Sequence, residues 1–199
     1  MGDSTGTFLM ILAGPAGSGK TTLCERMVAD VPGLERVVTA TTRPPRDGEV
    51  NGRDYHFLSE DEFTRRLEAG EFIEWARVHG RYRYGTLKSS VLDKLVNTNL
   101  IMNIDVQGVK NFRRVADENP FLKKRLVTVF IEPPSLEELR LRLHGRGKDN
   151  DAEIQRRLGT AQQELLERGT YDHVITSASK DADFAALRAL WNVERAKRS

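Results

Sequence analysis

Residues 14–21, with the sequence GPAGSGKT, constrain the fold of this chain more than any other feature. They match the pattern G-x-x-x-x-G-K-[ST], in which glycines let the backbone wrap closely around phosphate oxygens. The continuous apolar run FLMILA precedes them at 8–13, and KTTLCERMVAD, with apolar residues on one side, follows at 20–30. Because a buried strand before the loop and a helix after it are the context that this pattern requires, the sequence predicts a nucleoside triphosphate site.

The residues of this loop have separate expected roles. Backbone N–H groups form a cradle for phosphate oxygens, Lys20 reaches the β and γ phosphates, and the hydroxyl of Thr21 is the expected Mg²⁺ ligand. The positive end of the helix that begins there adds to the attraction. The expected nucleotide-binding residues are Gly14, Pro15, Ala16, Gly17, Ser18, Gly19, Lys20, Thr21 and Thr22.

Alternating strand and helix patterns extend this unit into an α/β fold. Buried strands are predicted at 100–105, 125–131 and 173–176, and helices at 107–117, 135–145, 152–168 and 181–197. The helix at 135–145 follows two prolines and has the capping pair Ser135 and Glu138. Strands that alternate with helices predict a three-layer parallel sheet of the P-loop kinase type, with right-handed crossovers.

Two insertions interrupt this rhythm. Residues 35–86 contain short extended pieces around a helix at 60–69, which Ser59 and Glu62 are expected to cap, so we predict a small strand-rich insertion. The polar stretch GRGKDNDAE at 145–153 predicts a short lid. The 199 residues then form a single domain, whose core comprises 7–34, 87–144 and 154–199.

Composition excludes several classes of function. With 31 basic and 29 acidic residues the charges are balanced, which argues against a nucleic-acid groove and for local anion sites. No apolar run approaches the roughly 20 residues of a membrane span. Cys24 is the single cysteine, so an internal disulfide is impossible, and we expect a reducing, cytoplasmic setting. The four histidines have no metal or triad spacing, and the sequence leaves open whether the protein is a monomer or a homo-oligomer.

The stretch TTRPPRDGEVNGRDYHF at 41–57 combines arginines with residues that fix backbone shape. Its two adjacent prolines push Arg43 toward an extended backbone, so Arg43 and Arg46 can be held toward one anion. Guanidinium groups match phosphate oxygens bidentately, and the hydroxyls of Tyr55 and Tyr84 can add hydrogen bonds. Taken alone, such a stretch is more often a stiff, solvated surface loop.

Several motifs together resemble those of guanylate kinases, in the order of that family and over roughly residues 8–190. They are TATTRPPRDGEVNGRDYHF, GEFIEWARVHGRYRYGT, IDVQG and EPPSLEELRLRLHGRG. The resemblance implies transfer of the γ-phosphate of ATP to GMP or dGMP, with Mg²⁺. It implies that the GMP phosphate is held by Arg43, Arg46, Tyr55 and Tyr84, and that the guanine is surrounded by Thr39, Glu74, Thr86 and Asp105. The cations implied for the donor and transferring phosphates are Lys20, Arg142, Arg146 and Arg157, with Arg43 as a further catalytic cation.

The chemistry of two carboxylates agrees with guanine as a ligand. Glu74 lies in an otherwise apolar strand, and a carboxylate can accept hydrogen bonds from the adjacent N1–H and N2–H₂ groups of guanine. Adenine presents an acceptor at N1, which the carboxylate would repel. The alternative for Glu74 is a solvent-facing residue at a sheet edge. Asp105 follows a buried strand, where it could contact a ligand, cap the helix at 107–117, or do both.

This sequence departs from the family pattern in three places. Asn103 stands where an acidic residue is usual, which weakens any expected water-mediated metal role there. The turn GRYRYGT is one residue longer than usual, so Tyr82 competes with Tyr84, and we favour Tyr84 because Gly85 and Thr86 follow it. ITSASKDAD at 175–183 replaces an Asn-Asp stretch near the donor base, where Ser177 or Ser179 could substitute.

Two other functions remain open at this point. One is a related P-loop kinase with a different phosphorylated acceptor, and the other is a non-catalytic module of the same fold that binds a partner protein. The intact phosphate loop speaks against the second. For an enzyme, we expect the lid and the insertion to close on the substrates, which excludes water from the transferring phosphoryl group.

Overall fold

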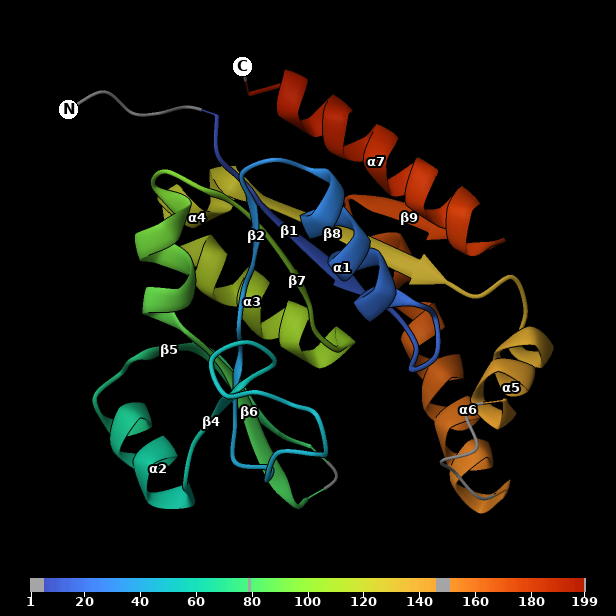
Figure 1. The fold of residues 1–199 in the computed structure, drawn as a ribbon, viewed down its shortest axis with the longest axis horizontal. Coiled ribbons are helices and arrows are strands. Elements are labelled where there is room, and N and C mark those ends of the chain that lie inside the picture. Colours follow the sequence, from blue (N-terminus) through green and yellow to red (C-terminus); the bar gives the residue numbers. More distant parts are fainter. Residues whose placement is uncertain (1–5, 79, 146–150, 199) are drawn as a thin grey trace.

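The structure of this chain is a computed structural model that describes residues 6–78, 80–145 and 151–198 (Figure 1). Within these residues the main sheet has five parallel strands in the order β2-β7-β1-β8-β9. They are β1 (Leu9–Ala13), β2 (Leu34–Arg36), β7 (Asn99–Asn103), β8 (Leu126–Glu132) and β9 (His173–Thr176). The helices of this part are α1 (Lys20–Asp30), α3 (Val106–Glu118), α4 (Pro120–Arg125), α5 (Leu136–His144), α6 (Asp151–Leu166) and α7 (Lys180–Ala196).

Side chains of the central strand β1 alternate between two apolar cores, one on each face of the sheet. Leu9 and Ile11 pack in the core to which α3 and α4 contribute, whereas Met10 and Leu12 pack in the core with α1 and α7. All four side chains are fully buried. A strand that is buried on both faces requires helices above and below the sheet, so three layers follow. The predicted α/β fold with a parallel sheet is confirmed.

Residues 40–87 form a smaller unit with its own sheet, in the order β4-β3-β6-β5. Its elements are β3 (Ala40–Thr41), β4 (His56–Phe57), α2 (Glu60–Glu68), β5 (Phe72–Val78) and β6 (Tyr82–Leu87). Phe63 of α2 stacks on Phe72 of β5 with ring centroids 4.4 Å apart. The guanidinium of Arg83, buried on β6, pairs with the carboxylate of Glu60 at 2.6 Å and so ties α2 to the sheet.

Helices α5 and α6 lie on the other side of the molecule from this unit, at the lower right of Figure 1. They pack on each other through the buried side chains of Leu139, Leu143, Ile154 and Ala161. Of the predicted lid at 145–153, residues 146–150 lie outside the described residues, and α6 begins at Asp151.

The capping signals in the sequence correspond to real helix ends. Ser59 Oγ accepts a hydrogen bond from the N–H of Glu62 at 3.1 Å, and Ser135 Oγ accepts one from the N–H of Glu138 at 3.0 Å. We did not predict α4 or the π-helical turn at Ser89–Asp93, because each is too short to show a helical period in the sequence. Strand β2 pairs with β7 and includes residues 35 and 36, which we had assigned to the insertion.

The two ends of the described chain meet at the amino end of β1. Phe8 packs against Trp191 of α7 with ring centroids 4.4 Å apart, and the guanidinium of Arg198 lies 4.9 Å from the centre of the Phe8 ring. A Cβ atom added to Gly6 would lie 3.7 Å from the carbonyl oxygen of Arg198. Among the helices of the described ranges, none combines the length and the apolar character that crossing a membrane requires.

Candidate active site

The loop between β1 and α1 has the backbone geometry of an anion cradle. Gly14, Gly17 and Gly19 have φ angles of 131°, 97° and 91°, in the left-handed region that favours glycine. A Cβ atom at Gly14 would lie 2.2 Å from the carbonyl oxygen of Ile131, so the loop passes too close to β8 for any side chain there. Among the residues that the structure describes, no side chain caps the start of α1, so its first N–H groups are available to an anion at the positive end of the helix.

The amine of Lys20 lies across this loop. Its Nζ donates hydrogen bonds to the carbonyl oxygens of Gly14 at 2.7 Å and Pro15 at 2.8 Å. Phosphate oxygens attract a cation more strongly than peptide carbonyls, so a bound triphosphate can draw this amine to itself. Thr21 and Thr22 are exposed in the first turn of α1. Their hydroxyls are thus accessible beside the cradle.

A cavity of about 420 Å³ beside the loop brings together residues that are far apart in the sequence. The phosphate loop contributes Gly14, Ala16 and Lys20, and the insertion contributes Thr39, Tyr55, Glu74 and Tyr84. The β7–α3 junction and α6 contribute Asn103, Asp105, Arg156, Arg157, Thr160 and Glu164. Four of the predicted substrate-binding and catalytic residues in the described ranges do not line the cavity: Arg43, Arg46, Thr86 and Arg142. Six of the predicted nucleotide-binding residues do not line it either: Pro15, Gly17, Ser18, Gly19, Thr21 and Thr22. Its volume suits a small organic ligand.

Glu74 on β5 is a buried carboxylate that faces this cavity. Its burial raises its pKa to about 7, although the hydrogen bond from the Thr86 hydroxyl favours the charged form, and nearby Asp105 raises the pKa further. Thr86 Oγ1 donates this bond to Glu74 Oε1 at 2.7 Å. Thr86 therefore acts on the cavity through Glu74, which offers acceptor oxygens to a ligand.

The β7–α3 junction presents two further polar side chains. Asp105 Oδ1 accepts a hydrogen bond from the N–H of Gly108 at 2.6 Å, so Asp105 caps α3 and lines the cavity at once. The predicted helix cap is confirmed, and contact of Asp105 with a ligand stays a prediction. Asn103 Oδ1 is buried beside the cavity and has no hydrogen-bond partner among the described residues. Such an oxygen is an acceptor that a ligand can satisfy.

Two tyrosines form one wall of the cavity. The rings of Tyr55 and Tyr84 meet edge to face with centroids 6.0 Å apart, and burial raises the pKa of the Tyr55 hydroxyl, which stays a neutral donor. Tyr82, the competing residue in the longer turn, does not line the cavity and has the guanidinium of Arg81 4.9 Å from its ring centre. Side chains alternate between the two faces of β6. Arg83, which lies between Tyr82 and Tyr84, therefore points to the opposite face, where it pairs with Glu60 of α2.

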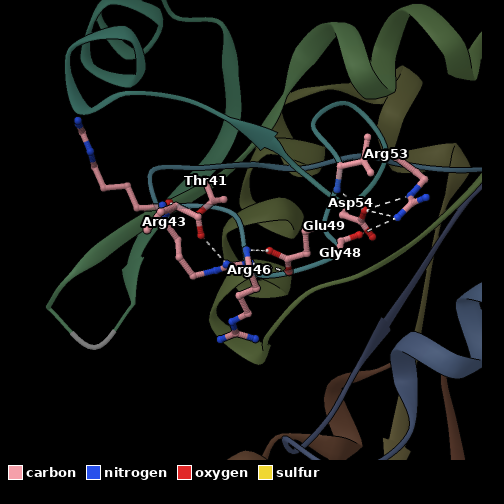
Figure 2. Close-up of polar contacts among 10 residues, drawn as sticks. Thr41, Arg43, Arg46, Gly48, Glu49, Arg53 and Asp54 are labelled. Carbon is pink, nitrogen blue, oxygen red and sulfur yellow. Dashed lines mark hydrogen bonds and ion pairs between the residues drawn. The ribbon is translucent and has the colours of Figure 1, made fainter.

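The side chain of Arg43 pairs with Glu49 (Figure 2). It does not line the cavity. Its Nη2 donates to Glu49 Oε1 at 2.8 Å, and its Nη1 donates to the carbonyl oxygen of Pro44 at 2.7 Å. The guanidinium is buried, and a buried cation requires a paired anion. Glu49, which the sequence analysis missed, supplies this anion. Its only signal was one charge in a loop rich in charges.

Arg46 contacts the same carboxylate through its backbone. Its N–H donates to Glu49 Oε2 at 2.7 Å, whereas its guanidinium extends away from Glu49 (Figure 2). Farther along the loop, Arg53 donates to the carbonyl oxygen of Gly48, and Asp54 accepts the N–H of Val50 at 2.8 Å. The loop is thus cross-linked by its own charged residues, and it presents one anion to Arg43 and to the backbone of Arg46.

Helix α6 contributes one wall of the cavity, of which we predicted only Arg157. Glu153 accepts hydrogen bonds from Arg156 Nη2 at 2.7 Å and from Arg157 Nε at 2.9 Å, and the two guanidinium groups hold the pKa of Glu153 at about 2. Thr160 and Glu164 follow Arg157 at spacings of three and seven residues. This helical period was a signal that could have identified both residues.

The remaining predicted residues lie near α5 and β9 or outside the described ranges. Arg142 on α5 donates to Glu138 and to Ser177, and Arg146 lies outside the described residues. Ser179 Oγ caps α7 by accepting the N–H of Ala182 at 3.2 Å. Neither Ser177 nor Ser179 lines the cavity, and neither does any histidine in the described ranges.

Comparisons with known proteins agree with one another. The sequence profile described as "Guanylate kinase" matches residues 7–193. The guanylate kinase of Wolbachia sp. subsp. Brugia malayi is 39% identical over 192 residues, which are 96% of this chain and 95% of that protein. The guanylate kinase of Geobacter sulfurreducens is 43% identical over 173 residues, 85% of this chain and 80% of that protein.

A solved structure gives the same result. The crystal structure of guanylate kinase from Anaplasma phagocytophilum superposes with a TM-score of 0.72 at 28% sequence identity. The match covers 98% of this chain and 87% of that one.

Proposed function

This chain belongs to the guanylate kinase family and is an ATP-dependent nucleoside monophosphate kinase that phosphorylates GMP; from this premise we propose how its residues divide the reaction. One observation carries the proposal. A single cavity is lined by the phosphate-loop amine of Lys20 and by two carboxylates, Glu74 and Asp105. The cation suits the phosphates of two nucleotides that meet in the cavity, and the carboxylates suit a bound guanine.

We propose that the guanine lies against Glu74 and Asp105, with Thr39 and Thr86 completing its surroundings. The ionised carboxylate of Glu74 accepts hydrogen bonds from N1–H and N2–H₂ of the base. Thr86 orients this carboxylate through the hydrogen bond to Oε1. Adenine would place an acceptor opposite Glu74, and the resulting repulsion excludes AMP.

The phosphate of GMP is proposed to contact the hydroxyls of Tyr55 and Tyr84, which line the cavity, and the guanidiniums of Arg43 and Arg46. Glu49 pairs with Arg43 and neutralises its charge. A phosphate dianion can share or displace this carboxylate, because guanidinium binds phosphate bidentately.

On the donor side, the backbone N–H groups of residues 14–22 are proposed to bind the ATP phosphates, with Lys20 at the β and γ groups. Arg142, Arg146 and Arg157 are proposed to add positive charge there, and Arg156 joins them because it lines the same cavity. The acceptor is already an anion, so the reaction requires no general base. The obstacle is the repulsion between two polyanions, which these cations offset while they hold the reacting groups in line.

Mg²⁺ is the proposed metal, and the residues present fit it. Thr21 places a hydroxyl beside the cradle, and Asn103 Oδ1 is a buried oxygen without a partner among the described residues. In the described ranges no three His, Cys, Asp or Glu side chains gather as a metal site, so phosphate oxygens would complete the coordination. When bound, the ion neutralises charge on the β and γ phosphates.

A comparison of acceptors tests the proposed function. Purified protein with Mg²⁺ and ATP should release ADP with GMP or dGMP, and at most weakly with AMP or with sugar phosphates. If AMP or a sugar phosphate is the better acceptor, the assignment of Glu74 and Asp105 to guanine is wrong. The protein would then be a related P-loop kinase with a different phosphorylated acceptor.

Lys20→Ala tests whether the protein is a catalyst or a binding module. We expect a loss of kcat of roughly several hundredfold, because the substitution removes electrostatic stabilisation of the transferring phosphoryl group. Steady-state kinetics of ADP release would measure it, with circular dichroism as the control for folding. Unchanged turnover in the folded variant would contradict the proposed role.

The proposed setting is the cytoplasm, where both nucleotides are available, and the proposed ligands are small nucleotides without nucleic acid or membrane. The balance of 31 basic and 29 acidic residues supports local anion sites over a polyanion groove.

A further inference from the structure

The hydroxyl of Ser177 lies in a buried chain of polar groups beside the phosphate loop. Arg142 Nη1 on α5 donates to Ser177 Oγ at 2.9 Å, and Ser177 Oγ donates to Asp183 Oδ2 on α7 at 2.6 Å. Asp183 Oδ1 accepts the N–H of Ala178 at 2.7 Å. Ser177 is 1% exposed and Asp183 is 7% exposed. These hydrogen bonds therefore link α5 to α7 through one residue of the β9–α7 loop, and Ser177 and Asp183 are buried.

The direction of every hydrogen bond in this chain is fixed by chemistry. A guanidinium has only donors, so Ser177 Oγ must accept from Arg142, and its single proton is then available for Asp183. The carboxylate of Asp183 has only acceptors, and it satisfies both the hydroxyl and the backbone N–H. The negative charge of Asp183 thus polarises the hydroxyl toward Arg142, which strengthens the hold on the guanidinium.

The hydrogen-bonded groups of Arg142, Ser177 and Asp183 are connected to the surroundings of the phosphate loop at two points. The N–H of Ser177 donates to the carbonyl oxygen of Glu132 at 2.8 Å. Glu132 directly follows Ile131, the residue of β8 against which Gly14 of the phosphate loop packs. A Cβ atom on Gly17 would lie 3.1 Å from Leu139, so α5 packs directly against the loop. Ser177 and Glu138 therefore hold Arg142 on the helix that packs against the loop.

We propose that Asp183 is a positioning residue, which acts through Ser177 to hold Arg142 ready for the phosphates of the donor nucleotide. This inference rests on the proposed donor role of Arg142. It also gives the Ser177 hydroxyl a different role from the contact with the donor base expected from the sequence. The hydroxyl accepts a hydrogen bond from Arg142 and donates its proton to Asp183, so its role is to hold the arginine in place.

The structure offers a matched control for this idea. Asp181 lies two residues before Asp183 in the same first turn of α7, and it pairs with Arg26 at the surface, with 91% of its side chain exposed. Exposed pairs of this kind contribute little. Asp181→Asn should therefore leave donor binding unchanged, while Asp183→Asn should not.

Asp183→Asn is the decisive variant because it keeps the shape of the side chain and reverses one of its polar ends. With the amide oxygen still accepting the N–H of Ala178, the amide N–H₂ group would face the hydroxyl of Ser177. Ser177 would then accept from Asn and could no longer accept from Arg142 with the same geometry. We expect KM for ATP to rise about tenfold, with KM for GMP within about twofold of the parent, as for the loss of one charge-assisted hydrogen bond. Ser177→Ala removes the link in another way and should give the same result if Asp183→Asn fails to fold.

A double-mutant cycle separates positioning from simple stability. In a background of Arg142→Ala, the substitution Asp183→Asn should add no further increase in KM for ATP, because its effect passes through Arg142. A structural defect would instead multiply the two effects and would raise KM for both substrates, and that result would overturn the proposal. So would an unchanged KM for ATP in folded Asp183→Asn.

Calorimetric titration with a non-hydrolysable ATP analogue makes the test independent of the acceptor reaction. The weaker binding expected for Asp183→Asn should appear there even if GMP proved to be the wrong acceptor. If wild-type protein phosphorylates GMP and the analogue binds Asp183→Asn as tightly as wild type, the proposed function stands and the positioning role is wrong.

Discussion

In the proposed function Glu74 selects the nucleotide, and its environment works against its charge. Burial raises its pKa to about 7, with the bond from Thr86 opposing and the charge of Asp105 adding to the rise. A guanine requires the ionised form, because only a carboxylate without its proton accepts hydrogen bonds from both N1–H and N2–H₂. Binding of GMP should therefore remove a proton from the part of the protein population that holds one at neutral pH.

We accordingly predict that the affinity for GMP rises with pH around neutrality. Between pH 6 and pH 8 the dissociation constant should fall by about tenfold, because the protonated fraction of Glu74 shrinks over this range. Calorimetry at several pH values, in buffers with different ionisation enthalpies, would measure both the affinity and the proton release. The phosphate of GMP also titrates near about pH 6, and Glu74→Gln provides the control, since it retains only the phosphate titration. Equal pH dependence in both proteins would contradict this role.

The same residue should affect stability, with a sign that follows from its raised pKa. Between pH values of about 4.5 and about 7 the folded state binds more protons at Glu74 than the unfolded state, so the folded state loses stability as pH rises through this window. Glu74→Gln should therefore increase the free energy of unfolding at pH 8 by on the order of 2 kcal/mol, and by much less at pH 4.5. Urea unfolding at the two pH values measures this difference. A gain that is equal at both would point to packing as the cause.

At this scale, the sequence identified residues whose chemistry is distinctive in their local context. Glu74 was visible as a carboxylate in an apolar strand, and Tyr84 was favoured over Tyr82 by the residues that follow it. Glu49 and Glu153 were not identified, because a carboxylate that neutralises an arginine resembles any other surface charge until the contact is known. The chain through Ser177 was hidden for the same reason, since its partners lie on separate elements.

At the scale of elements, Asp105 at the β7–α3 junction is a helix cap, and we propose that it also binds the guanine. Its carboxylate caps α3 through the N–H of Gly108 and faces the cavity as well. We predict that Asp105→Asn keeps the cap and that Asp105→Ala loses about 1 kcal/mol of stability. Both variants should raise KM for GMP by about tenfold through the loss of the anionic acceptor.

Urea unfolding and steady-state kinetics measure the two tasks separately. A normal KM for GMP in Asp105→Asn would mean that Asp105 is only a helix cap.

Elements with strong local signals were predictable, and short ones were not. The buried strands and the caps at Ser59 and Ser135 correspond to clear patterns. Helix α4 covers residues 120–125 and has few turns in which a period could develop. Strand β2 is an edge strand of only three residues, so the sequence carried no clear signal that residues 35 and 36 pair in the main sheet.

At the scale of the whole molecule, the cavity is built from parts that are joined by few segments. The insertion carries Glu74 and Tyr84, the core carries Lys20, and α6 carries Arg157. We predict that GMP and an ATP analogue together draw the insertion and the α5–α6 side toward the core, as polyanion and cations pair. Fluorescence energy transfer between a label on α2 and one on α6 should increase only when both nucleotides are present.

Small-angle X-ray scattering should give a smaller radius of gyration when both nucleotides are present. Unchanged dimensions and unchanged transfer would mean that the cavity is already in its working shape.

The contact of Gly6 with Arg198 has a practical consequence. The place where the first and last described residues meet lies at the amino end of β1. Strand β1 has five residues and rises about 3.3 Å per residue, so this place is roughly 16 Å from the phosphate cradle. A short peptide tether could close the polypeptide into a ring at this place without pulling on the cradle. A surface or reporter attached there would likewise lie away from the cradle.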